Sequence, residues 1–74
     1  MIALKLTELI VGQRGRVTWV DAKKINPQIL EIGLVENTEF EVISKTGNFI
    51  EVEFYNTKFA IHRNDADCII VVRS

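Results

Sequence analysis

The sequence predicts a small, mainly β domain, and three observations support this fold class. Several short segments alternate apolar and polar residues with the period of two that is typical of half-buried strands. Turn-forming residues separate these segments at short intervals. The single helical pattern covers only about two turns, which is too short to be stable alone in water, so it must pack against the sheet.

The first predicted strand is the β-favouring run RVTWV, Arg16–Val20. Before it, Thr7 is placed to cap a short turn. Two alternatives remain open for the inner face of this strand. Strict alternation puts Val17 and Trp19 on the same face, whereas a β-bulge pairs Val17 with Val20 and turns Trp19 outward.

The segment INPQILEIG, residues 25–33, carries the start and stop signals of a short helix. Asn26 is a favoured N-cap, and Pro27 suits the first helical position because its missing N–H costs nothing there. Gly33 is placed where the chain leaves the helix in a left-handed conformation. Asn37 is then expected to adopt a positive φ in the turn before the next strand.

A three-stranded meander follows the helix. Its strands are expected at residues 39–45, 49–55 and 58–62, separated by turns at Thr46–Asn48 and Asn56–Thr57. The apolar residues expected on its inner face are Phe40, Val42, Ile50, Val52, Phe54, Phe59 and Ile61.

The last elements complete the predicted architecture. The polar residues 63–67 predict one 3₁₀ turn around Ala66, and the final strand at residues 68–73 is apolar on both faces. We therefore predict a five-stranded SH3-like barrel with one short helix, formed by residues 1–74 as a single domain. Closing the sheet in this way removes exposed edges. An OB-fold fits less well because it usually has longer strands and a longer helix.

Composition excludes several classes of function. A chain of 74 residues with one cysteine, Cys68, has room for one domain and no internal disulfide. We expect no signal peptide, and no apolar run approaches the about 20 residues of a membrane span. Its net charge of −1 argues against general nucleic-acid binding, for which Arg14, Arg16, Lys23 and Lys24 would have to line one face. We expect a soluble cytoplasmic domain.

No set of residues predicts an enzyme. A nucleophilic pair of His62 and Cys68 would need a third group to orient the base. The spacing H-x-x-D-x-D-C over residues 62–68 matches no standard zinc or calcium pattern. We expect no catalytic residues, no cofactor and no metal site. Direct metal sensing through His62, Cys68 and the nearby aspartates is a second hypothesis, from a different class.

The aromatic residues indicate an interaction surface. Trp19, Phe49 and Tyr55 are out of phase with the inner face or ambiguous, and exposed aromatic residues often mark protein–protein contacts. We predict a partner interface at Trp19, Lys23 and Lys24, joined by Phe49 and Tyr55 from the meander. The two-faced last strand also permits a homodimer.

The order of these elements resembles the FeoA family, small SH3-like proteins of bacterial ferrous iron uptake. The resemblance is carried by LTELIVGQRGRV (residues 6–17), ILEIGL (29–34), TEFEVI (38–43) and FAIHRNDADCIIV (59–71). Two positions depart from the family pattern. The family usually has glycine where Asn37 stands, and it often has arginine near Gln28.

The resemblance implies a cytoplasmic accessory protein that associates with FeoB, the membrane ferrous-iron permease with a cytosolic GTP-binding domain. Contact with the membrane would be indirect, through that transporter, and the family has no known catalytic residues. The alternative is a metal-binding or metal-sensing module related to the C-terminal domain of iron-dependent repressors of the DtxR type. Such repressors need an upstream DNA-binding portion, for which we expect no room in 74 residues.

Overall fold

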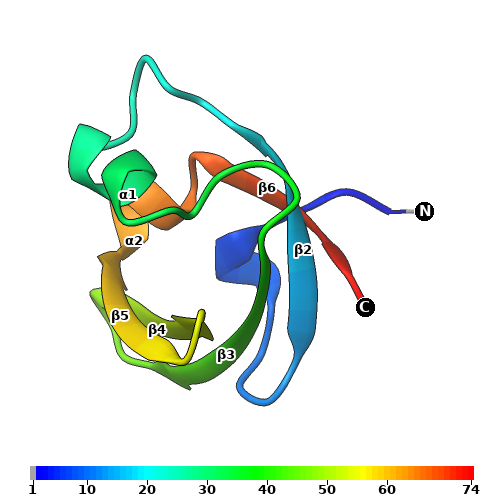
Figure 1. Ribbon diagram of the computed structural model, residues 1–74. Coiled ribbons are helices and arrows are strands. Elements are labelled where there is room, and N and C mark those ends of the chain that lie inside the picture. The colour runs from blue at the N-terminus through cyan, green and yellow to red at the C-terminus, as the bar shows by residue number, and fades with distance from the viewer. Residues whose placement is uncertain (1) are drawn as a thin grey trace.

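The computed structural model describes residues 2–74, and a six-stranded antiparallel sheet curls around one core (Figure 1). The strands are β1 Leu4–Lys5, β2 Arg14–Val20, β3 Glu39–Lys45, β4 Phe49–Phe54, β5 Thr57–His62 and β6 Ile69–Arg73. They follow the order β1-β6-β2-β3-β4-β5 across the sheet. The short helices are the 3₁₀ helix η1 Leu6–Glu8, α1 Pro27–Glu31 and α2 Arg63–Ala66. The predicted SH3-like class is confirmed, with the two-residue strand β1 in addition.

The core is built from the alternating residues of the strands. The fully buried side chains include Leu6, Leu9, Val17, Leu34, Val42, Val52, Ile61, Ile69 and Val71. The predicted inner face of the meander is confirmed, although Phe59 is only partly buried. The second apolar face of β6 is only partly covered within the chain, since Val72 is 7% exposed but Ile70 is half-buried.

Strand β2 contains a β-bulge. Its register with β6 shifts between Val17 and Trp19, so that Trp19 lies opposite Ile70. The Thr18 hydroxyl donates a hydrogen bond to the Ile70 carbonyl oxygen at 3.1 Å. Val17 is fully buried, Val20 packs against the core, and Trp19 is 51% exposed. The structure therefore has the second of the two predicted alternatives.

The connection from α1 to β3 forms as predicted. The side chain of Asn26 accepts a hydrogen bond from the backbone N–H of Gln28 at 3.0 Å, and Pro27 begins the helix. Gly33 has φ +101° and Asn37 has φ +74°. The N–H of Asn37 donates to the carbonyl of Val17 at 2.7 Å, which ties this turn to β2.

Three local predictions are corrected. Thr7 caps no turn, because Lys5 is the N-cap of η1 and its N–H donates to Glu8 Oε1 at 2.8 Å. The turn between β4 and β5 consists of Tyr55 and Asn56, both with positive φ, as in a two-residue type I′ hairpin; the prediction placed it one residue later. The turn at α2 is α-helical rather than 3₁₀, although Ala66 is fully buried there.

Among residues 2–74, no helix combines the length and the apolar character needed to cross a bilayer.

Candidate functional site

The five predicted interface residues are all exposed, but they do not form one patch. Tyr55 is 73% exposed, Trp19 51% and Phe49 45%, and Lys23 and Lys24 are exposed in the segment between β2 and α1. Phe49 begins β4 and Tyr55 follows its end, so the six steps between them span about 20 Å. Trp19 lies on β2, which is separated from β4 by β3.

Phe49 packs against another side chain of the same protein, which makes it a weaker candidate for the partner interface. Its ring packs edge-on against the ring of His62, with centroids 5.4 Å apart and planes at 81°. His62 in turn accepts a hydrogen bond at Nδ1 from the N–H of Asn64 at 3.1 Å, which caps α2. This pair stabilises the start of α2.

The side chains of the second hypothesis, direct metal sensing, also make structural bonds. Asp65 accepts a hydrogen bond from the N–H of Asn26 at 3.0 Å, and Asp67 accepts one from the Thr7 hydroxyl at 2.7 Å. These bonds join segments that are 39 and 60 residues apart in sequence. Within the part of the chain that the structure describes, no three His, Cys, Asp or Glu side chains are grouped to hold a metal ion.

Cys68 is held as a thiol. Burial raises the pKa of the Cys68 thiol above its ordinary value, and the carboxylates of Asp21 and Asp65 raise it further. Its Sγ lies 3.6 Å from the carbonyl oxygen of Asn64, to which it donates. A thiol with a raised pKa is a poor nucleophile at neutral pH, because the thiolate is the reactive form.

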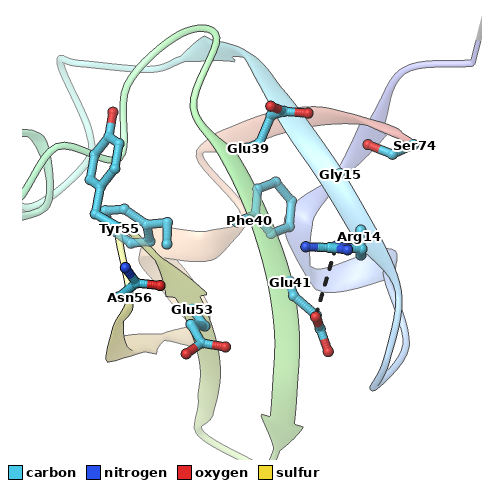
Figure 2. A pocket seen from close by; sticks show the side chains of 10 residues that line it. Arg14, Gly15, Glu39, Phe40, Glu41, Glu53, Tyr55, Asn56 and Ser74 are labelled. Carbon is cyan, nitrogen blue, oxygen red and sulfur yellow. Dashed lines mark ion pairs between the residues drawn. The ribbon is translucent and has the colours of Figure 1, made fainter.

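An aromatic cleft of about 430 Å³ opens between the β2–β3 pair and the turn after β4 (Figure 2). In Figure 2, Tyr55 and Glu53 lie on one side of this cleft, Arg14 and Glu41 lie on the other, and Phe40 lies between them. Three rings and three carboxylates dominate its lining: Phe40, Phe54, Tyr55, Glu39, Glu41 and Glu53. This combination is suited to binding a group that has an apolar stem and a positive charge.

Gly15 gives the cleft its depth. A Cβ added there would lie 2.8 Å from the carbonyl oxygen of Val72 and 3.0 Å from Cζ of Phe40. The absence of a side chain therefore lets the Phe40 ring lie directly against β2. An isolated glycine inside a strand pattern signals such a close approach, but the strand predicted from the sequence began only at Arg16 and so left Gly15 outside it.

Tyr55 is held over the cleft by its backbone and by a second glycine. Its φ of +53° is uncommon for a bulky residue. A Cβ on Gly33 would lie 3.3 Å from Cε2 of Tyr55, so the ring packs where Gly33 has no side chain. The ring also meets Phe54 edge-on, with centroids 5.6 Å apart. The position of Tyr55 is defined although most of its surface is in solvent.

The charge of the cleft is negative. Glu41 lies directly opposite Glu53 in the register of β3 and β4, an arrangement that is unfavourable for two like charges. Arg14 Nε lies 3.8 Å from Glu41 Oε1, and this is the one ion pair among residues 2–74. The sequence-based prediction missed all three glutamates, because polar residues on the outer face of a strand look like ordinary solvated positions.

A second, smaller hollow lies beside the predicted Trp19–Lys24 segment. It has a volume of about 300 Å³ and is lined by Val20, Ala22, Leu30, Val35 and Glu36. Val20 and Ala22 lie between the predicted interface residues Trp19 and Lys23 in the sequence. This apolar hollow gives the Trp19–Lys24 segment a surface on which a partner could be bound.

Comparisons with known proteins agree with this fold. The family model described as the FeoA domain matches residues 4–73. A comparison with curated proteins found no match. The chain is similar to the crystal structure of an iron uptake regulatory protein (FeoA), with a TM-score of 0.86, 20% identity and 100% of both chains covered. At that identity, the likeness shows the fold alone.

Two further solved structures extend the comparison. The FeoA protein from Chlorobium tepidum is 29% identical, with a TM-score of 0.81, 95% of this chain and 70% of that chain covered. IdeR from T. acidophilum is 16% identical, with a TM-score of 0.88, and this chain spans 35% of its length. The second likeness again shows the fold alone. Because the family model covers residues 4–73 of 74, the chain belongs to the FeoA domain family.

Proposed function

We propose that the protein is a cytoplasmic, non-enzymatic accessory protein of ferrous iron transport, which acts by binding the cytosolic portion of a FeoB-type permease. The observation that carries this proposal is the family match over residues 4–73. The solved structure of an iron uptake regulatory protein (FeoA) shares the fold over the full length of both chains, in agreement with the family match. Contact with the membrane is indirect, through the permease.

The surface supports binding rather than catalysis. Exposed aromatic residues are over-represented among the residues that dominate binding energy in interfaces, and Trp19 and Tyr55 are both more than half exposed. The aromatic cleft and the apolar hollow beside Trp19 are two separate surfaces that a partner can use. A homodimer stays a prediction, which light scattering on the purified protein checks.

The proposal is tested by binding and by transport. The cognate cytosolic portion of the permease should retain the protein in a pull-down, and its GTPase rate should change when the protein is added. Ferrous iron uptake should fall in a strain that lacks the protein and return with the wild-type copy. Neither binding nor any effect on GTPase rate or uptake would contradict the proposal.

Direct metal binding through His62, Cys68 and the nearby aspartates is the second candidate function, and it rests on the sequence alone because the likeness to IdeR shows only the fold. The structural bonds of Asp65 and Asp67 weigh against it, because these carboxylates are already hydrogen-bonded. Calorimetry with ferrous iron or zinc decides: one tight site that disappears in His62→Ala supports metal binding, and a flat titration excludes it.

A further inference from the structure

We propose that the aromatic cleft binds an arginine side chain from the partner protein, with the guanidinium over the ring of Tyr55 and attracted by the negative charge of Glu39 and Glu53, which lie at opposite ends of the cleft (Figure 2). This inference deepens the proposed function by naming the chemistry that the partner presents. It rests on the proposed function for the identity of the partner, whereas the binding chemistry is a property of the cleft itself.

The aromatic rings suit the arginine stem and its planar head. Phe40 and Phe54 are 4% and 3% exposed, so only their edges reach the cleft and form an apolar floor. Long basic side chains lay their methylene groups along such surfaces and keep the charge at the rim. The exposed ring of Tyr55 then offers its face to the cation, which the ring quadrupole attracts.

The carboxylates supply the complementary charge. Glu39, Glu41 and Glu53 all line the cleft, and the Arg14–Glu41 contact is the ion pair present in the described part of the chain. Glu53 lies opposite Lys58 in the β4–β5 register without forming an ion pair with it. Two carboxylates therefore stay available, and a cation from outside would also relieve the repulsion between Glu41 and Glu53.

The arrangement favours a guanidinium over a metal ion or an ammonium group. No three acidic or other metal-ligating side chains among residues 2–74 are close enough to coordinate one ion, so the charge of the cleft is spread around its rim. A guanidinium matches a spread charge because it carries five N–H donors in one plane. It also stacks on aromatic rings and is less strongly hydrated than an ammonium group.

The inference is tested with a small probe on the full chain. N-acetyl-arginine amide is titrated into ¹⁵N-labelled protein, and the amide shifts of residues 53–56 should move. The uncharged isostere N-acetyl-citrulline amide should move them far less. Tyr55→Ala and Glu53→Gln should each weaken the arginine probe about two- to fivefold, and added salt should weaken it further.

Matched variants separate a specific site from a general charge effect. Glu31→Gln removes the same charge from an exposed position of α1 that does not line the cleft, and should leave probe affinity unchanged. Tyr55→Phe keeps the ring and should bind as the wild type does. Dispersed amide spectra confirm that each variant is folded. Equal shifts with the arginine and citrulline probes, or equal losses in Glu31→Gln and Glu53→Gln, would overturn the inference.

The same variants distinguish this inference from the proposed function. If the cytosolic portion of the permease binds Tyr55→Ala and Glu53→Gln as well as the wild type, the inference fails and the proposed function stands. If the arginine probe binds the cleft but the permease does not bind, the cleft chemistry is supported and the proposed function fails. Parallel loss of both kinds of binding supports both.

Discussion

At the scale of single residues, two glycines of the same sequence have opposite environments. Gly15 lies inside β2, where a Cβ would meet the Val72 carbonyl oxygen at 2.8 Å and the Phe40 ring at 3.0 Å. Gly47 lies in the turn between β3 and β4, and a Cβ there would have no neighbour within 4 Å. Position 15 needs glycine because the backbone of Val72 occupies the space that a Cβ would take. Position 47 does not need glycine, because that space is open.

We predict that Gly15→Ala lowers the free energy of unfolding by about 2 kcal/mol, because β2 and β6 must separate to admit the methyl group. Gly47→Ala serves as the control and should be neutral or stabilising by about 0.5 kcal/mol, since it restricts only the unfolded chain. Urea denaturation measures both. Equal stability of the two variants would show that β2 and β6 can move apart without any loss in the free energy of unfolding.

Asn37 carries a second residue-scale prediction. Its φ of +74° is tolerated best by glycine and next best by asparagine. Asn37→Gly should be neutral or stabilising, although it removes the 3.3 Å hydrogen bond from Arg16 to the Asn37 side chain. Asn37→Val should cost about 1–2 kcal/mol, because a β-branched residue is strained there. Equal melting temperatures for the three proteins would contradict this account of the turn.

At the scale of elements, the β4–β5 hairpin contains an unfavourable turn residue. Type I′ turns favour Asn-Gly, whereas this turn is Tyr55-Asn56 with φ values of +53° and +59°. The ring of Tyr55 is 73% exposed, so burial compensates for little of this strain. A strained, exposed aromatic residue at the rim of the cleft is consistent with a role in binding.

We predict that the double substitution Tyr55→Asn and Asn56→Gly raises the free energy of unfolding by about 1 kcal/mol and weakens binding of the arginine probe. Thermal denaturation and the amide titration measure the two effects on one variant. Asn56→Gly alone is the control, since it relaxes the turn and keeps the ring. Loss of stability in the double variant would show that contacts of Tyr55 with Gly33 and Phe54 outweigh the strain.

At the scale of the whole molecule, α2 joins parts of the chain that are far apart in sequence. The hydroxyl of Thr7 in η1 donates to Asp67 at 2.7 Å, across 60 residues. The N–H of Asn26, the N-cap of α1, donates to Asp65 at 3.0 Å, across 39 residues. In Figure 1, α2 lies beside α1 at one end of the curled sheet. Asp65 in α2 and Asp67 at its C-cap therefore hold α1 and η1 to this end of the barrel.

We predict that Thr7→Val and Asp65→Ala each lower the free energy of unfolding by about 1 kcal/mol and that their effects add, because the two bonds share no partner. Urea denaturation of the single and double variants measures this. Glu36→Ala, at an exposed position, is the control and should change stability by less than about 0.5 kcal/mol. Unchanged midpoints in both single variants would show that α2 docks through Ala66 alone.

The candidate site was predictable only in part. Tyr55 and Trp19 were recognised because they are out of phase with the inner face, and both are exposed. Glu39, Glu41 and Glu53 were not recognised, because a glutamate on an outer face has the same pattern whether or not a cleft lies beside it. Which of them face one another depends on the register of β3 and β4.

The sequence by itself determined the features that depend on near neighbours. Asn26, Pro27 and Gly33 define α1, and Asn37 forms its turn, because caps and left-handed positions are decided within a few residues. The period of two likewise assigns the inner face of each strand of the meander.

Only the tertiary structure decided the features that depend on pairing between distant strands. The bulge that turns Trp19 outward arises from the register of β2 on β6, and β1 exists as a strand only because it pairs with β6. The cleft likewise forms where β2, β3 and β4 meet around Gly15. Such pairings join residues far apart along the chain, and no local pattern of residues specifies them.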